Sequence, residues 1–344
     1  MVCQYLRRSR LEIAYYQYSY TGRRLDMLIR KLLPAFVAAL TLGMAMPAQS
    51  ADAPAEHAPA KITNLTVGVL PISDTVAVYI ADKQGLFAKR GLSIKVVPAP
   101  GGAAATSGLL SGQMQFAFGS YVPFILAAAK GAPLVLASPT EMTSGVPSGL
   151  VVLANSKYKK TAELAGAKIA VSALANIGTV AIREQISAAG VDAASIKYVA
   201  LPFPNMLAAL EHGQVDAAWL VEPFLTQALE MGARVLFNPF AAPMPDVPMA
   251  GYMATKKYVA DNPQIVARFN EALQEGADIA KKNPQTYRDM LPTYTKIPPT
   301  VAAKMQLNTF SSQAPQAGMQ KLADLMAKSK LLDGHFDVAP LYQH

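Results

Sequence analysis

Six short segments of this chain carry hydroxyl, amide and glycine residues where strands are expected to end and helices to begin. None of the six contains Lys or Arg; they are residues 71–75, 99–103, 119–123, 140–144, 172–179 and 202–206. Backbone N–H groups at a helix N-terminus, with neighbouring hydroxyls, can hold an anionic group without a basic side chain. These residue types therefore predict noncovalent capture of a small polar or anionic molecule.

Twelve residues, eleven of them within these segments and one (Glu222) outside them, are the candidate ligand contacts. They are Ser73, Thr75, Gly102, Ser120, Tyr121, Thr143, Asn176, Gly178, Thr179, Phe203, Asn205 and Glu222. Ser120 and Asn176 are the best anion candidates, although Ser and Asn are also preferred helix caps. Asp74 is expected to cap a helix.

Glu222 and Trp219 each allow two interpretations. Glu222 follows an apolar strand and could accept a hydrogen bond from a ligand, or it could be an acid favoured by the dipole of the next helix. Trp219 could stack on a ligand ring, but a single Trp in an apolar strand is more often part of the core.

The chain lacks the residue sets of common catalytic sites. Its histidines (His57, His212, His335 and His344) show no metal-ligand spacing, and no phosphate-binding loop is present. The one cysteine, Cys3, lies before the expected mature chain, which therefore has neither a disulfide nor thiol chemistry. We expect no enzyme activity, no metal and no cofactor.

The elements that must position these residues alternate as strand and helix. Apolar runs that begin at residues 65, 94, 115 and 134 predict four strands, and a second set begins near residue 150. Such alternation favours mostly parallel sheets with helices on both faces. From Pro263 the chain becomes helical, with Asn262 as the expected cap and one apolar face formed by Val266, Phe269, Leu273, Ala277 and Ala280.

A pattern repeated about 100 residues apart indicates two similar lobes. Its two copies are Leu109-x-x-Gly112-Gln113-x-x-x-Ala117 before Pro123-Phe124, and Leu210-x-x-Gly213-Gln214-x-x-x-Ala218 before Pro223-Phe224. Each copy predicts a helix, a strand and a helix. We assign residues 62–148 plus 249–344 to lobe 1 and residues 149–248 to lobe 2, with a ligand cleft between them.

The N-terminal 50 residues have the layout of a secretory signal. Met27 is followed by basic residues, an apolar run over residues 32–46 and small residues around Ser50. We expect Met27 to be the true start, cleavage near Ser50, a disordered leader over residues 51–61, and a location in the periplasm. Residues 1–50 hold seven of the 31 Lys and Arg but two of the 23 Asp and Glu, so the net charge falls from +8 to +3. A mature charge of +3 gives no case for nucleic-acid binding.

Three segments in order resemble one family. They are Gly85-Leu86-Phe87-Ala88-Lys89-Arg90-Gly91-Leu92, Gly166-Ala167-Lys168-Ile169-Ala170-Val171, and Leu210 to Trp219 followed by Glu222-Pro223-Phe224. Over residues 62–330 the chain resembles the periplasmic solute-binding proteins of nitrate, sulfonate and taurine ABC importers, whose superfamily includes a thiamine-pyrimidine synthase. The resemblance implies a type II clamshell that closes over one ligand.

The resemblance also implies a function and leaves alternatives open. We expect a monomer that delivers a small organic acid, either an organosulfonate such as taurine or an alkanesulfonate, or an aromatic carboxylate, to an ABC-transporter membrane permease. The alternatives are a pyrimidine-precursor binding protein, a receptor-coupled sensor, and a thiamine-pyrimidine-synthase-like enzyme.

Overall fold

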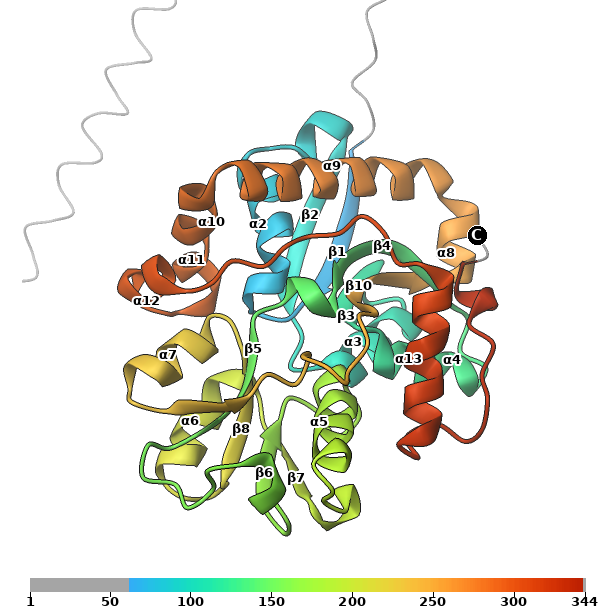
Figure 1. The fold of residues 1–344 in the computed structure, drawn as a ribbon. Coiled ribbons are helices and arrows are strands. Elements are labelled where there is room, and N and C mark those ends of the chain that lie inside the picture. The colour runs from blue at the N-terminus through green and yellow to red at the C-terminus, as the bar shows by residue number, and fades with distance from the viewer. Residues whose placement is uncertain (1–61, 343–344) are drawn as a thin grey trace, which may run out of the picture. The chain divides into compact units, whose positions relative to one another are not determined.

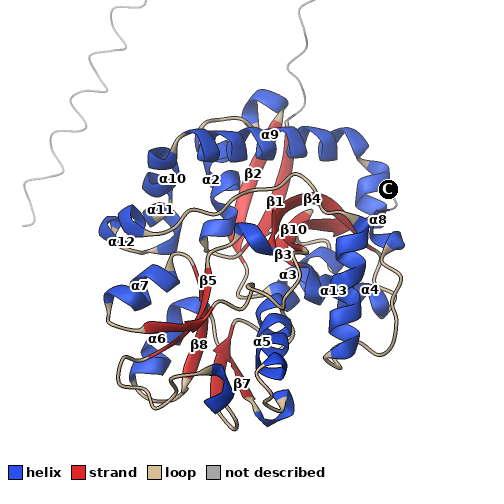
Figure 2. Cartoon of the chain, in the orientation of Figure 1, coloured by secondary structure: helices blue, strands red, loops and turns tan. Residues whose placement is uncertain are grey.

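The computed structural model describes residues 62–342, which form two five-stranded sheets flanked by helices (Figures 1 and 2). The predictions about the secretory signal, Met27, the cleavage site and the leader lie outside the described residues. Among the residues that are described, no helix is long and apolar enough to cross a membrane.

The first sheet has the strand order β2-β1-β3-β10-β4. Strand β1 pairs in parallel with β2 and β3, whereas β10 is antiparallel to β3 and β4. Four strands therefore run in one direction and only β10 runs in the other. The bounds are β1 (Thr63–Val69), β2 (Leu92–Pro98), β3 (Phe116–Ser120), β4 (Leu134–Met142) and β10 (Pro248–Thr255).

The second sheet repeats this arrangement with the order β7-β6-β8-β5-β9, in which β5 is the antiparallel strand. The bounds are β5 (Ser148–Val152), β6 (Lys168–Val171), β7 (Lys197–Ala200), β8 (Ala217–Val221) and β9 (Arg234–Phe237). In each sheet the reversed strand is the first one after the chain crosses from the other sheet. The prediction of a two-lobed α/β fold with mostly parallel sheets is confirmed.

The repeated pattern forms the same structure in both lobes. The first copy is α3 (Gly102–Leu110), β3 and α4 (Tyr121–Ala129), and the second is α6 (Phe203–Glu211), β8 and α7 (Phe224–Glu230). Gly112 and Gly213 follow the first helix of each copy with φ of +75° and +65°. This left-handed conformation ends a helix and favours glycine, which explains the repeated glycine. Strands β3 and β8 are each third in their sheets.

The remaining helices lie mainly on the first sheet's side of the chain (Figure 1). Helix α9 packs against α2, and its predicted apolar face is buried, with Phe269 stacked 4.1 Å from Phe116 between ring centroids. Helix α13 contacts α4 and β10. The exact lobe limits at residues 149 and 248 stay a prediction. The bounds are α2 (Val76–Lys83), α5 (Ile177–Ala188), α8 (Lys256–Asp261), α9 (Pro263–Lys282), α10 (Pro284–Met290), α11 (Pro292–Thr295), α12 (Pro299–Lys304) and α13 (Gln316–Lys328).

Of two expected helix caps, Asp74 is wrong, and Asn262 is confirmed in its position although its side chain makes no capping bond. Asp74 lies in a short 3-10 turn before α2, and its carboxylate accepts from Asn308 Nδ2 at 3.0 Å instead of capping the helix. Asn262 precedes Pro263 at the start of α9 as predicted, but its amide donates to the Tyr258 carbonyl at 3.0 Å. In both cases another partner takes the side chain.

Candidate functional site

A pocket lies where strands of both sheets end. Its lining includes Leu70 after β1, Ser120 at the end of β3, Ser172 after β6 and Val221 at the end of β8. About 490 Å³ of the pocket is not filled by protein atoms, and part of this volume is open solvent. Ligands of open α/β sheets bind at the carboxyl ends of strands, so the position is that of a ligand site.

Three helices begin at this pocket with a small or polar residue, and a fourth, α6, begins there with Phe203. Gly102 is the first residue of α3, Ser120 precedes α4 and Asn176 precedes α5; all three line the pocket. The N-terminal N–H groups of a helix have no partner within the helix, and the helix dipole favours negative charge there. No Lys, Arg or His is among the residues that line the pocket. An anionic group would therefore be held by backbone N–H groups and hydroxyls.

Ser120 and Asn176 differ in what their side chains do. Asn176 Oδ1 accepts from the Thr179 N–H at 2.8 Å, and its Nδ2 donates to Ser172 Oγ at 2.6 Å, so Asn176 caps α5. Ser120 stands at the corresponding position of α4 without a side-chain capping bond. The Ser120 hydroxyl therefore has no capping role and is available to a ligand.

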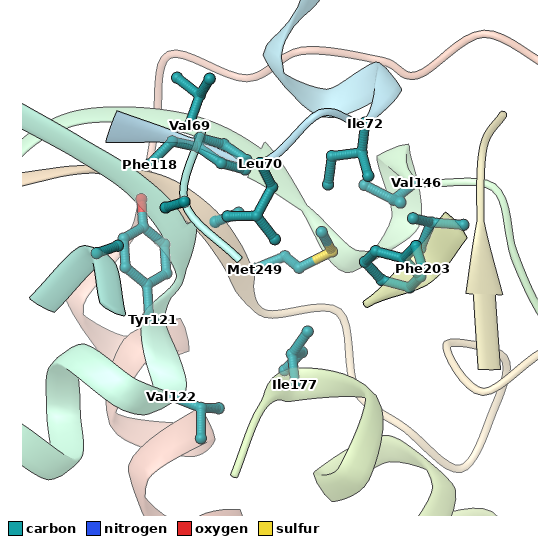
Figure 3. Packing of buried hydrophobic residues seen from close by; sticks show 14 of the residues in the cluster. Val69, Leu70, Ile72, Phe118, Tyr121, Val122, Val146, Ile177, Phe203 and Met249 are labelled. Atoms are coloured by element: carbon teal, nitrogen blue, oxygen red, sulfur yellow. The ribbon is translucent and has the colours of Figure 1, made fainter. Parts of the chain in front are cut away.

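Apolar side chains form the rest of the wall. In Figure 3, Met249 lies between Leu70 and Phe203, and Ile177 points toward them from the start of α5. The Trp219 ring also lines the pocket and is fixed because its Nε1 donates to the buried Ser148 Oγ at 2.7 Å. Trp219 is therefore a core residue whose ring also reaches the pocket wall, and stacking on a ligand ring stays a prediction.

Gly178 allows α5 to approach this ring. A Cβ atom at Gly178 would lie 2.3 Å from Trp219 Cε3, closer than any real contact. Gly178 is predicted from the sequence as a ligand contact, but it does not line the pocket and instead permits close packing behind the pocket wall.

Four of the twelve predicted residues line the pocket: Gly102, Ser120, Asn176 and Phe203. The structure places the other eight elsewhere, either buried in hydrogen-bonded or packed positions or, for Asn205, exposed near the start of α6; they are Ser73, Thr75, Tyr121, Thr143, Gly178, Thr179, Asn205 and Glu222. Sequence reasoning missed the apolar lining residues Leu70, Ile72, Phe118 and Ile177, because an apolar residue at a strand end carries the same signal as any core residue.

One of these eight residues, Thr143, lies at a crossing between the sheets, and another, Thr75, lies in the loop after β1. Thr143 Oγ1 donates to Asp246 Oδ1 at 3.0 Å, which joins the two crossing segments to each other. Thr75 donates to the Leu70 carbonyl at 2.9 Å and holds the loop after β1. Both residues position pocket loops without reaching the pocket themselves.

Glu222 is a structural acid. Its carboxylate accepts from the Thr226 N–H at 3.1 Å, from Thr226 Oγ1 at 2.8 Å and from the Gln306 N–H at 3.2 Å. Burial raises its pKa, and the bonds from Thr226 oppose that rise. The interpretation as an acid at a helix N-terminus is therefore the one that the geometry supports.

A buried carboxyl pair lies beside the pocket, and one of its members, Asp74, also lines the pocket. Asn308 Nδ2 donates to Asp74 Oδ1 at 3.0 Å and to Glu141 Oε1 at 2.9 Å, while Tyr287 and Ser73 complete the surroundings. Burial raises the pKa of both carboxyl groups, and the nearby Asp74 charge adds to the rise at Glu141. Asn308 lies 234 residues from Asp74, so no sequence pattern indicated this pair.

Two α/β lobes that share a pocket at the carboxyl ends of their sheets define the fold of periplasmic binding proteins. The structure is similar to the alkanesulfonate-binding protein of Xanthomonas axonopodis pv. citri bound to MOPS (TM-score 0.72, 20% identity, 81% of this chain and 98% of that one). It is also similar to the periplasmic aliphatic sulphonate-binding protein of Escherichia coli (TM-score 0.68, 22% identity, 82% and 92%).

The chain belongs to the NMT1/THI5-like family, whose model matches residues 73–287. A relative from Brucella abortus (strain 2308), which carries only a provisional designation as a binding protein, is 24% identical over 240 residues, covering 68% of this chain and 73% of the relative.

Proposed function

We propose that this chain is the extracytoplasmic substrate-binding component of an ABC importer and that it captures a small organic acid between its lobes. One observation carries the proposal: the N-termini of α3, α4 and α5 reach a single pocket whose lining has no basic side chain. Helix N-termini supply partial positive charge and free N–H donors, which suits a sulfonate or carboxylate group.

The apolar wall favours an organic acid over a bare ion. Phe118, Phe203 and Trp219 line the same pocket as Ser120, so a ligand with a carbon body would fill the space beside its charged group. Nitrate would leave these rings without a partner. The ligands that fit are an organosulfonate such as taurine or an alkanesulfonate, or an aromatic carboxylate. The sulfonate ligands named for the two similar structures support this class.

The proposed mechanism is hinge closure. A ligand that touches Ser120 in lobe 1 (residues 62–148 plus 249–344) and Asn176 in lobe 2 (residues 149–248) stabilises the arrangement in which both contacts are made. The proposed lobes also touch between α5 and the end of α13. Lys328 of α13 pairs with Glu184 of α5 at 2.6 Å, and Arg183 of α5 donates to the Ser329 carbonyl at 2.9 Å. The closed monomer then docks on a membrane permease in the periplasm and releases its cargo.

Binding rather than catalysis is proposed because the pocket lining contains no histidine, lysine or cysteine, and its one carboxyl group, Asp74, accepts a hydrogen bond from Asn308. Ser120 therefore has no histidine beside it, among the residues that line the pocket, to activate it as a nucleophile.

A pyrimidine precursor is the second candidate, because the Asp74 carboxyl also lines the pocket. A carboxylate can accept hydrogen bonds from a ring N–H or amino group. Asp74 does not exclude the organic acid of the first proposal. Burial raises the Asp74 pKa and so favours the neutral carboxyl, which repels an anion less than a carboxylate would.

The test uses the single tryptophan, Trp219, which lines the pocket and reports occupancy through its fluorescence. The purified protein is titrated with taurine, alkanesulfonates, aromatic carboxylates, nitrate and an aminopyrimidine. We expect saturable binding of an organic acid and none of nitrate. Binding of nitrate without any organic acid would overturn the proposal, whereas binding of the aminopyrimidine that is lost in Asp74→Asn would establish the second candidate.

A further inference from the structure

A second apolar groove lies against the proposed ligand pocket. Three loops form it: residues 70–72 after β1, residues 98–100 at the end of β2, and residues 202–204 at the start of α6. It therefore also joins the two lobes, and its lining consists only of apolar residue types.

The groove has almost no free backbone donors. Five of its nine lining residues are prolines, which have no N–H: Pro71, Pro98, Pro100, Pro202 and Pro204. The N–H groups of Ile72 and Ala99 already donate to the Leu70 and Val69 carbonyls. Because few polar groups would lose water, an apolar guest can cover this surface at little cost. Proline rings also keep the three loops rigid, so the groove is formed before a guest arrives.

The pocket and the groove differ in the helix N-termini that reach them. Helices α3, α4 and α5 begin at the pocket, whereas α6 begins where the pocket and the groove meet. Its first residue, Phe203, lines both sites, and Pro204, which lines only the groove, has no N–H group to donate. An anionic group is therefore favoured in the pocket and disfavoured in the groove. The two sites share Leu70, Ile72 and Phe203, so they meet along one apolar wall.

We propose that the groove holds the apolar tail of an amphiphilic organic acid whose charged head lies in the pocket. This inference rests on the proposed function and extends it to a substrate class, namely sulfonates or carboxylates with an extended alkyl or aryl tail. Pro98, Pro100, Pro202 and Pro204 are exposed around the groove, so a long tail can enter from the solvent side.

The experiment measures the Kd of a homologous series from ethanesulfonate to decanesulfonate by calorimetry, below micelle-forming concentrations. Each methylene that enters the groove should tighten binding by about fourfold. Pro204→Gln places a neutral polar side chain in the groove and should flatten this gain for the long chains while leaving ethanesulfonate unchanged. Pro263→Gln is the matched control, since Pro263 is also an exposed proline in the first turn of a helix.

The outcomes separate the two proposals. Long chains that bind no more tightly than ethanesulfonate, or a gain that Pro204→Gln leaves intact, would overturn the groove assignment while the proposed function stands. If sulfonates and the corresponding carboxylates of every length fail to bind, the proposed function itself fails. A gain lost equally in Pro263→Gln would also contradict a specific role for the groove.

Discussion

Ser73 and Glu222 join the two lobes, although 149 residues separate them in the chain. The Glu222 carbonyl accepts from the Ser73 N–H at 3.1 Å and from the Ser73 hydroxyl at 2.9 Å. The same hydroxyl lies 2.8 Å from Asn308 Oδ1. A single buried serine thus links the loop after β1, the end of β8 and the C-terminal segment.

Ser73→Ala should lower stability without removing the pocket. The variant keeps the backbone bond but loses a buried hydroxyl, so the free energy of unfolding should fall by about 1–2 kcal/mol in urea denaturation. Ser107→Ala on α3 is the control, because Ser107 is exposed and bonds only within its own helix. Equal stability of the two variants would show that the Ser73 hydroxyl contributes nothing.

Glu141→Gln should change how stability depends on pH. Burial raises the Glu141 pKa well above the ordinary glutamate value of 4.5. Below about pH 4.5 the carboxyl is neutral in both the folded and unfolded chain. As the pH rises, the unfolded chain releases the proton first. This lowers the free energy of unfolding by up to about 1.4 kcal/mol per pH unit until the folded carboxyl ionises.

The glutamine variant removes this dependence because its amide does not titrate. Gln Oε1 can still accept from Asn308, and Gln Nε2 can donate to Asp74. We therefore expect Glu141→Gln to be more stable than the parent at neutral pH, with a shallower decline above pH 4.5. Asp74, whose pKa is also raised, acts in the same direction, so a slope remains. The exposed Glu211→Gln is the control, and parallel pH profiles for Glu141→Gln and the parent would refute this account.

Ser120→Ala should weaken ligand binding selectively. The Ser120 hydroxyl lines the pocket and makes no capping bond, so its loss should raise the Kd of an organic acid by about tenfold. The free energy of unfolding should stay within about 0.5 kcal/mol of the parent. Trp219 fluorescence titration and urea denaturation measure the two quantities.

Asn176→Ala serves as the comparison for Ser120→Ala. Because Asn176 caps α5, its loss should cost about 1 kcal/mol of stability in addition to any effect on binding. If Ser120→Ala instead loses stability and keeps its affinity, the hydroxyl has a structural role.

Gly178→Ala should disturb the pocket wall from behind. The added methyl group would meet the Trp219 ring at 2.3 Å, so α5 or the ring must shift. We expect a loss of about 1–3 kcal/mol in stability and a changed Trp219 emission spectrum. Gly101→Ala tests the specificity of this effect, since its nearest contact would be an ordinary 3.7 Å. An unchanged spectrum in Gly178→Ala would argue against the close packing.

The sequence by itself determined the features that depend on near neighbours. The repeat containing Gly112 and Gly213, the helix that begins at Pro263 and the alternation of strands and helices were all readable. Each reflects hydrogen bonds and apolar periodicity within about four residues. The absence of Lys and Arg from the expected ligand loops was equally visible, and it indicated the pocket's chemistry before its position was known.

Only the tertiary structure decided which side chains face the pocket. Ser120 and Asn176 occupy the same kind of position, yet Asn176 caps its helix and Ser120 does not. Asp74 and Glu222 looked like a local cap and a possible ligand contact, but Asn308 and Gln306 from the C-terminal segment engage them. Packing brings these partners together across 84 to 234 residues, and no local pattern encodes a contact at such a distance.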